Sequence, residues 1–288
     1  MLIQKSIKRW YNFFRMRSPK IAIIIHAHHL SVLQEILDCV QNVSGNFDLF
    51  LNFSYITHSQ KKMIDKLKKD LTKSVPGTCY FTTSNNRGQD LGGFFASTEV
   101  ARRNKLSYDF ICKLHTKSDS KQLTPFKKSG YTFTDDVYTI GSKPDAHNNY
   151  NKTEWRQSLL STLLGTKDRV HKILKLFTLY PSVGMVCVKD FYGPHDFNMK
   201  DNVKNYQFFK NKMKLNDEVC WPNNKNFAAG TMFWLRGDVW DFLIKQKITI
   251  KDFELGAACD GLRSHAFERM FDSVVKHLGY SPWMVEGK

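Results

Sequence analysis

A glycine-rich segment with a cation beside a carboxylate is the first stretch whose residue types suggest binding chemistry. It joins a predicted strand to a predicted helix, so its backbone N–H groups and the positive helix end can face an anion. Arg87 can contact a phosphate, and Asp90 can accept hydrogen bonds from the hydroxyl groups of a nucleotide sugar. The spacing matches neither the dinucleotide-binding glycine pattern nor a P-loop, so a connection made only for tight helix packing stays open. The segment reads Asn85-Asn86-Arg87-Gly88-Gln89-Asp90-Leu91-Gly92-Gly93.

Three polar residues follow a predicted buried strand in the segment YDFICKLHTKSD. If the strand continues, alternation places His115, Lys117 and Asp119 on one side. When a nucleoside diphosphate leaves a sugar, negative charge grows on its phosphates and must be met by cations or a metal ion. Lys117 and His115 can meet this charge directly, and Asp119 can hold a divalent cation such as manganese or magnesium. A solvated strand end is the alternative interpretation.

Small residues stand before an apolar run in the last third of the chain. Ala229, Gly230 and Thr231 precede Met232-Phe233-Trp234. Because these side chains are small, the backbone there can approach a sugar closely. We therefore expect Ala229, Gly230 and Thr231 to bind the acceptor.

A predicted helix over about residues 262–278 carries the candidate general base. Asp260 can cap this helix, and His265, Glu268 and Arg269 lie within one turn of one another. A carboxylate near a helix start can deprotonate an acceptor hydroxyl. Glu268 is the first candidate and Asp260 the second, with His265 beside them. A His and Glu pair on a surface helix is the alternative.

Three histidines, His26, His28 and His29, end the first predicted strand. Imidazole nitrogens are common zinc ligands, but the sequence places no fourth ligand nearby. We expect His26 to lie at a polar strand end that faces the nucleotide. Metal ligation by the three histidines stays open as a second interpretation.

The order of elements predicts how these groups are positioned. Strands and helices alternate from residue 20 to about 117, which predicts a mostly parallel sheet with helices on its faces. Ligands of such sheets bind outside the C-terminal ends of the strands. In the second half we expect polar insertions at 118–151 and 190–226. The other expected elements are helices at 153–164, 167–177, 237–246 and 262–278, and strands at 183–188 and 227–236.

Composition and charge limit the classes of protein. The 288 residues carry 43 Lys and Arg against 27 Asp and Glu, and the net charge of +16 attracts polyanions. An apolar share of 42% excludes global disorder. The longest apolar run, Ile21 to Ile25, is far shorter than the roughly 20 residues that span a bilayer. The six cysteines form no CxxC pair, so we expect them to be reduced, and we expect a cytoplasmic protein.

Residues 1–18 are predicted to form a basic amphipathic helix that ends before Pro19. Its aromatic and aliphatic residues suit a lipid interface, and the cations around them suit anionic headgroups. A helix that packs on its own domain is the alternative. Residues 19–288 are then expected to form a single domain. The apolar positions at helical spacing are Ile3, Ile7, Trp10, Phe13 and Phe14.

Five separated motifs resemble, in order, the rhamnan synthesis F family of bacterial polysaccharide glycosyltransferases over about residues 20–275. The resemblance implies a GT-A-like α/β fold, a Rossmann-type mostly parallel sheet flanked by helices. It implies transfer of rhamnose, a similar deoxyhexose or galactofuranose from a dTDP- or UDP-linked donor. The acceptor would be a lipid-linked glycan or a growing cell-surface polysaccharide, such as O-antigen or capsule, at the inner face of the membrane. We expect an inverting displacement. The motifs are NNRGQDLGGFF, YDFICKLHTKSD, EWRQSLLSTLLG, FAAGTMFWLR and HAFERMF.

The resemblance also implies residue roles. The NNRG segment falls where GT-A enzymes hold the nucleotide, and the HAFER helix falls where they carry the acidic base. The HTKSD segment falls where they carry a metal-binding DxD, from which this sequence departs, so a divalent cation is not certain. The implied donor-binding residues are His26, Asn86, Arg87, Gly88, Asp90, His115, Lys117, Asp119 and Arg156, and the implied catalytic residues are Glu268, Asp260 and His265.

Two other classes of function stay open. A nucleic-acid-binding protein is favoured by the charge of +16 and the aromatic content, although recognised binding motifs are absent and we expect no nucleic-acid partner. A histidine-based metal hydrolase would use His26, His28 and His29.

Overall fold

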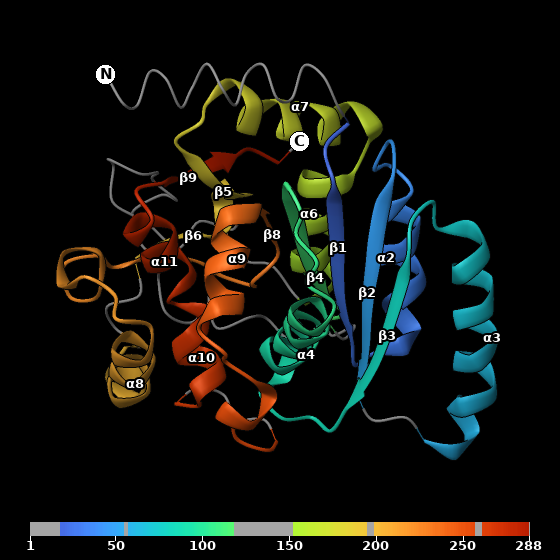
Figure 1. Cartoon of the computed structure of the whole chain (residues 1–288), viewed down its shortest axis with the longest axis horizontal. Coiled ribbons are helices and arrows are strands. Elements are labelled where there is room, and N and C mark those ends of the chain that lie inside the picture. The colour runs from blue at the N-terminus through green and yellow to red at the C-terminus, as the bar shows by residue number, and fades with distance from the viewer. Residues whose placement is uncertain (1–17, 55–56, 118–151, 195–198, 257–260, 288) are drawn as a thin grey trace.

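A seven-stranded sheet organises the chain, as the computed structural model in Figure 1 shows. The structure describes residues 18–54, 57–117, 152–194, 199–256 and 261–287. The strand order is β3-β2-β1-β4-β8-β5-β9. Strands β3, β2, β1 and β4 run parallel, β8 runs antiparallel to both of its neighbours, and β5 pairs with β9 in parallel. The predicted mostly parallel α/β sheet is therefore confirmed.

The first half follows the predicted alternation closely. Each strand of this half except the last is followed by a helix that covers one face of the sheet and returns the chain to begin the next parallel strand. The elements are β1 (Ile21–Ala27), α2 (Leu33–Val40), β2 (Phe47–Ser54), α3 (His58–Ser74), β3 (Cys79–Ser84), α4 (Gln89–Arg103) and β4 (Phe110–His115).

The second half supplies the remaining three strands of the main sheet and a small two-stranded sheet, β6-β7. The predicted helices at the start of this half and the strand after them are confirmed. The elements are α6 (Lys152–Leu164), α7 (Lys167–Leu179), β5 (Val183–Val188), β6 (Tyr192–Pro194), α8 (Val203–Met213), β7 (Asn226–Ala228), β8 (Phe233–Arg236), α9 (Gly237–Lys245), α10 (Arg263–Glu268), α11 (Phe271–His277) and β9 (Ser281–Val285).

Two predictions for the second half were wrong in detail, and strand β9 (Ser281–Val285) was missed. The single strand expected over 227–236 is two strands, because the chain turns between them with Gly230 at φ +87° and Thr231 at φ +47°. The single helix expected over 262–278 is α10 and α11, separated at Arg269 and Met270. Strand β9 was not expected. Its half-exposed residues lack the buried apolar run that made β1 and β5 easy to predict.

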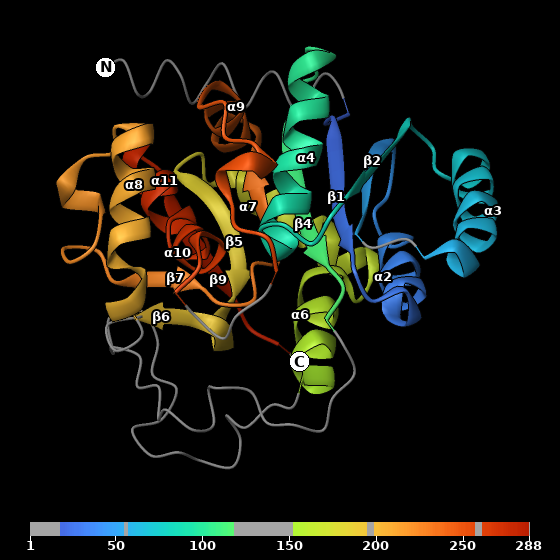
Figure 2. The same ribbon diagram turned by 90° about the horizontal axis from the view of Figure 1, so that it is seen from below.

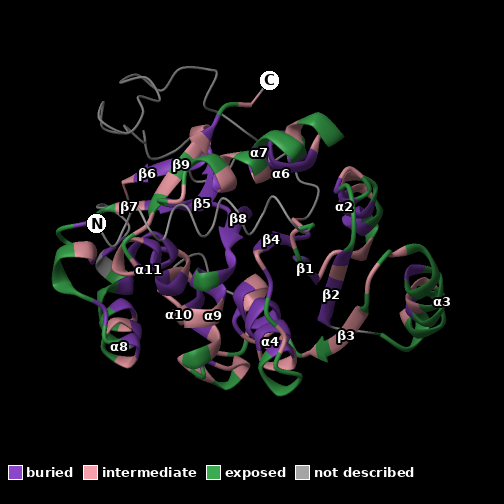
Figure 3. Cartoon of the chain, turned by 45° about the horizontal axis from the view of Figure 1, so that its top comes forward, coloured by how far each residue is buried: buried purple, intermediate pink, exposed green. Residues whose placement is uncertain are grey.

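Two hydrophobic clusters fill the spaces on either side of the sheet. Ile23 and Ile25 of β1 face one cluster with residues of α2, α3, α6 and α7. Ala22 and Ile24 face the other cluster with residues of α4, α8, α9, α10 and α11. Figure 2 shows α4 and α9 on the opposite side of the sheet from α2 and α6, and Figure 3 shows the buried strands between them. The fold therefore has three layers, with helices on both faces as predicted.

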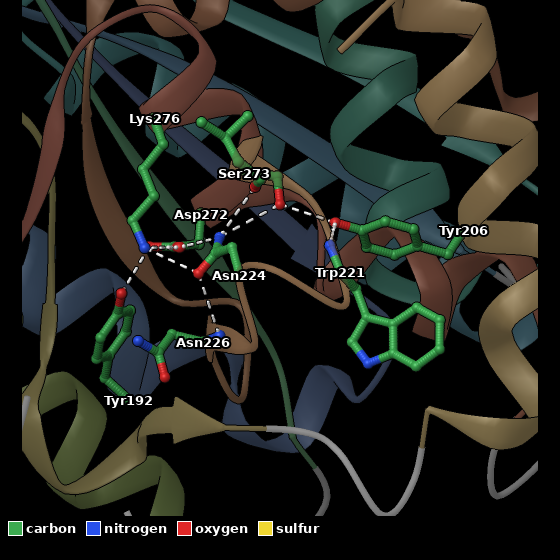
Figure 4. Close-up of polar contacts among 9 residues, drawn as sticks. Tyr192, Tyr206, Trp221, Asn224, Asn226, Asp272, Ser273 and Lys276 are labelled. Atoms are coloured by element: carbon green, nitrogen blue, oxygen red, sulfur yellow. Dashed lines mark hydrogen bonds and ion pairs between the residues drawn. The ribbon is translucent and has the colours of Figure 1, made fainter. Parts of the chain in front are cut away.

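The predicted insertion at 190–226 is anchored by a buried polar network, shown in Figure 4. The carboxylate of Asp272 on α11 is fully buried and accepts hydrogen bonds from Tyr192 (2.7 Å) and from Asn224 Nδ2 (2.7 Å). Lys276, one turn later, pairs with the same carboxylate at 2.9 Å and donates to Asn224 Oδ1 at 2.8 Å. Because every partner is satisfied, the buried charge is tolerated, and it ties β6 and the segment before β7 to α11.

Several predictions fall outside the described residues. They are the basic amphipathic helix over 1–18, described only from residue 18, and the polar insertion over 118–151. Within the described ranges, no helix has the length and apolar character needed to cross a membrane. The described cysteines, Cys39, Cys79, Cys112, Cys187 and Cys220, are free thiols.

Gly93 on α4 allows the helix to lie directly on the ends of β1 and β2. A Cβ at this position would lie 2.0 Å from His26 Nδ1 and 2.8 Å from Asn52 Oδ1, which is closer than van der Waals contact allows. The preceding Gly92 has a similar restriction, since its Cβ would lie 1.8 Å from the carbonyl oxygen of Arg87. These two glycines set the distance between the start of α4 and the polar ends of the strands.

This close approach predicts the sign of a stability change. Alanine normally stabilises a helix interior by about 1 kcal/mol relative to glycine, but Gly93→Ala should destabilise the protein by about 1–3 kcal/mol because it overpacks against His26. Urea denaturation measures the change. The cost should fall when Gly93→Ala is combined with His26→Ala, which removes the obstructing ring. A stabilising Gly93→Ala would show that α4 is not held against β1.

Candidate functional site

Polar side chains gather where β1, β2 and β4 end beneath the start of α4. His26 pairs in register with Asn52 on β2 and with His115 on β4. Because side chains alternate along a strand, these residues and Lys113 point to the same face as the apolar Ile24. The strands are thus apolar along most of this face and become polar at their C-terminal ends. This is the edge at which open α/β sheets bind ligands.

A buried ion pair joins α4 to the sheet. Lys113 is 1% exposed, and its Nζ lies 2.6 Å from Asp90 Oδ2. The same ammonium donates to the carbonyl oxygen of Thr231 at 2.9 Å, and Thr231 Oγ1 donates to Asp90 at 2.5 Å. Burial disfavours the charged carboxylate, but the positive charge of Lys113 and the two hydrogen bonds outweigh it and hold the pKa of Asp90 below its ordinary value. The carboxylate of Asp90 is therefore ionised at neutral pH.

His115 and Glu268 each form a hydrogen bond with the backbone of Gly230. His115 Nε2 donates to the carbonyl oxygen of Gly230 at 2.8 Å, since a carbonyl can only accept. Glu268 Oε1 accepts from the backbone N–H of Gly230 at 2.9 Å. Burial lowers the pKa of Lys113, and the negative charges of Asp90 and, more weakly, Glu268 oppose this shift. The predicted base, two of the predicted acceptor residues (Gly230 and Thr231) and the ion pair therefore form one continuous cluster.

His26 is held in a second hydrogen-bonded group on the β2 side of the cluster. Its Nδ1 lies 2.9 Å from Asn52 Oδ1 and its Nε2 lies 3.5 Å from Ser54 Oγ. Asn52 Nδ2 donates to Thr82 on β3, which fixes the amide orientation. Burial lowers the pKa of His26 to about 4 and that of His115 to about 3, and the negative charge of Asp90 only partly opposes this. Both imidazoles are neutral at pH 7.

The predicted NNRG segment is fastened to the chain that precedes α10. Gly88 N–H donates to the Glu254 carbonyl at 2.9 Å, and the Gly256 N–H donates to the Asn86 carbonyl at 2.9 Å. The guanidinium of Arg87 donates to the Phe253 carbonyl at 2.6 Å. Gly88 has φ +70°, the left-handed conformation that glycine adopts at little cost. Arg87 thus has a structural contact in addition to any contact with a phosphate.

Lys117 and Arg156 lie together beyond the end of β4. Lys117 Nζ lies 3.8 Å from the centre of the Trp155 ring, so it does not continue the strand side of His115 as alternation predicted. Arg156 is buried, pairs with Glu35 of α2 at 2.8 Å, and donates to the Lys117 carbonyl at 2.8 Å. Arg156 therefore fixes the path of the chain that leaves β4.

The remaining predicted residues have separate placements. His265 Nδ1 accepts from the Leu262 N–H at 3.3 Å, so this side chain caps its own helix, and its Nε2 lies 3.5 Å from Gln89 Nε2. Ala229 is buried, and its N–H donates to the Phe191 carbonyl at 2.8 Å. Asp119 and Asp260 lie outside the described residues.

The described side chains that could ligate a metal do not form a site for a divalent cation. Among the described residues there is no group of three or more His, Cys, Asp and Glu side chains arranged to hold a metal. Asp90 is ion-paired with Lys113, and His28 Nδ1 lies 2.8 Å from Ser54 Oγ. His26, His28 and His29 therefore belong to a hydrogen-bonded strand end.

Sequence reasoning missed three members of the cluster, Lys113, Asn52 and Ser54. A signal for Lys113 was available, since a lysine inside the apolar strand segment FICKLH must be buried and therefore needs a partner. Asn52 similarly interrupts the run FLNF of β2. Neither position identifies its partners, because they come from distant parts of the chain. Lys113 contacts Asp90 and Thr231, and Asn52 contacts His26 and Thr82.

The ion pair predicts an asymmetric pattern of stability. Asp90→Asn leaves the Lys113 ammonium buried without a counter-charge and should cost about 3–5 kcal/mol. The double variant Asp90→Asn with Lys113→Met removes both charges and should recover at least half of that loss. Urea denaturation of the single and double variants measures both values. Equal losses in both would mean that the pair does not hold the structure together.

The two buried histidines predict an acid-sensitive fold. Their folded pKa values lie below the unfolded value of about 6.5, so the unfolded chain takes up protons first and stability falls as pH decreases from 6.5 toward 4. Between pH 6.5 and pH 5, the free energy of unfolding should fall by about 2 kcal/mol for each histidine, because each pH unit in this range is worth 1.36 kcal/mol. Denaturation experiments between pH 7 and pH 5 measure how steeply the free energy of unfolding depends on pH. His115→Gln should reduce this dependence, whereas the control His58→Gln, at an exposed position, should not.

The comparisons with known proteins agree with the motif resemblance. Two relatives align over 275 residues at 26% identity: the uncharacterized protein WxcX of Xanthomonas campestris pv. campestris strain B100 and its counterpart in a second strain. The alignments cover 93% of this chain and 33% of each relative, so the chain spans about a third of the length of the curated relatives it matches. The family described as rhamnan synthesis protein F matches residues 1–138 and 127–280. The chain belongs to the rhamnan synthesis protein F family.

Proposed function

We propose that this chain is a glycosyltransferase of bacterial polysaccharide synthesis, using a GT-A-like arrangement of the sheet. The observation that carries the proposal is the cluster of Asp90, Lys113, His115 and Glu268 around the 230–231 turn, at the ligand-binding edge of the sheet, in a chain of the rhamnan synthesis protein F family. The donor would be a dTDP- or UDP-linked sugar, such as rhamnose, a similar deoxyhexose or galactofuranose. The acceptor would be a lipid-linked glycan or a growing cell-surface polysaccharide.

The donor would lie along the ends of β1, β3 and β4. The backbone at Asn86 to Gly88 is held rigidly by the segment 254–256, so a nucleotide placed there would meet a preorganised surface. Lys117 lies just beyond β4 and carries a positive charge toward which a diphosphate would be drawn. His26 and His115 are neutral, so they would act as hydrogen-bonding groups and not as cations.

Glu268 is the proposed general base. In an inverting transfer, an acceptor hydroxyl attacks the anomeric carbon, the bond to the nucleoside diphosphate breaks, and a carboxylate takes the hydroxyl proton. The backbone N–H of Gly230 holds one carboxylate oxygen of Glu268, which fixes its orientation. The strained turn at Gly230 and Thr231 brings the backbone to this carboxylate, as expected of a site where geometry matters more than local stability.

The proposal extends to location. The protein would act at the inner face of the cell membrane as a peripheral protein, and the basic helix predicted over residues 1–18 would assist its attachment. A screen of UDP-, dTDP- and GDP-linked sugars by thermal shift tests the donor assignment, because a ligand that binds the folded state raises the unfolding temperature. No stabilisation by any of these donors would contradict the proposal.

The base assignment predicts a selective loss of turnover. Glu268→Gln should lower kcat by roughly 10²- to 10⁴-fold while leaving the donor-induced thermal shift nearly unchanged, because the amide keeps the shape but cannot take a proton. Glu218→Gln, at an exposed position, is the matched control and should be fully active. If Glu268→Gln loses donor binding as well, Glu268 has a structural role and Asp260 becomes the candidate base.

A further inference from the structure

We propose that the outer face of α3 is a docking surface for an anionic phospholipid bilayer. The surface consists of Lys62, Lys66, Lys69 and Lys73, called here the lysine stripe. It stands apart from the candidate site and needs neither a sugar donor nor an acceptor. The inference rests on the proposed location at the membrane, names the surface that makes the contact, and is tested separately from the donor and base assignments.

The helical period separates the two faces of α3. Ile64 and Leu71 are buried and belong to the core cluster on that side of the sheet. The stripe residues follow one another at intervals of four, three and four, so they share one line on the opposite side of the helix. All four are exposed. At 1.5 Å per residue the line is about 16 Å long, enough to meet several lipid headgroups together.

The positive charges of α3 outnumber its negative charges. Helix α3 carries six lysines against two acidic residues, Asp65 and Asp70. In the described ranges no ion pair involves the stripe, whereas lysines on other elements do have partners, such as Lys189 with Glu286 and Lys212 with Asp252. Lys68, which is not in the stripe, turns inward to the rings of Phe53 and Phe81. Within the described residues, the stripe therefore presents four exposed ammonium groups that form no ion pair, although Asp65 and Asp70 lie within one turn of them.

The position of α3 suits a planar partner. Figures 1 and 2 both show α3 at one end of the molecule, beside the edge strand β3, and Figure 3 shows its outward side exposed. Beside the stripe, Met63 is 52% exposed, an apolar side chain that a headgroup boundary can accommodate. Nucleic-acid surfaces typically combine arginine forks and aromatic stacking with their charge, and α3 contains no arginine, phenylalanine, tyrosine or tryptophan. These features favour a bilayer over a nucleic acid.

Vesicle binding by the full chain tests the inference. The test variant replaces Lys62, Lys66, Lys69 and Lys73 by glutamine, which has nearly the same helix propensity as lysine. The control variant replaces four exposed lysines on α7, α8 and α9, Lys167, Lys175, Lys204 and Lys245, and so has the same net charge. Both keep residues 1–17, so any contribution from that segment is the same. Equal thermal unfolding of the three proteins excludes misfolding.

We expect wild-type protein to sediment with phosphatidylcholine vesicles containing phosphatidylglycerol, but not with pure phosphatidylcholine, and to be released by salt. A near-surface lysine is worth roughly a factor of five in affinity, so the test variant should bind more than about 100-fold more weakly, and the control less than about threefold. Equal weakening in both variants would show that only net charge matters. Unchanged vesicle binding in the test variant, or a loss confined to duplex DNA binding, would overturn the proposal.

Discussion

The buried contact between Lys113 and Asp90 is the interaction on which the geometry of the candidate site depends. It joins the middle of the sheet, the start of α4 and the 230–231 turn through one ammonium and one carboxylate. A lysine that is 1% exposed is tolerated only because its donors meet a carboxylate and a carbonyl, and the aromatic rings of Phe94 and Phe233 lie within 6 Å of its Nζ. Removing only one partner would leave the other charge buried and unpaired, which is strongly destabilising. The pair therefore specifies how these three elements pack together.

The surrounding structure is arranged to permit this contact. Glycines at 92 and 93 let α4 approach the strand ends closely enough for Asp90 to reach Lys113. The left-handed turn at Gly230 and Thr231 presents one carbonyl to Lys113, another to His115 and an N–H to Glu268. The network around Asp272 holds α11, and α11 continues directly from the helix that carries Glu268. Strain at the turn is therefore compensated by contacts from several directions.

Electrostatics divide the molecule into two kinds of surface. At the candidate site, charge is buried and paired, and the two histidines are kept neutral, so oriented hydrogen bonds position the side chains there. On α3, charge is exposed and unpaired within the described residues, so it acts at longer range and is screened by salt. The net charge of +16 is therefore not spread evenly, because the buried ion pair contributes no net charge, whereas the lysines of α3 carry part of the excess on one outer helix.

The sequence by itself determined the alternating elements of the first half, the polar character of the strand ends and the family. Those features are local, because the period of apolar residues and the short motifs carry them. The tertiary structure decided which polar groups meet. Lys113 is separated from Thr231 by 118 residues and His115 from Gly230 by 115, so no spacing in the sequence relates them. The tertiary structure also decided that residues 227–236 form two strands. Gly230 and Thr231 adopt a left-handed backbone conformation between them, and in this conformation they contact Lys113, His115 and Glu268. Periodicity reports which side of an element is buried, whereas the partner found there depends on how distant elements pack.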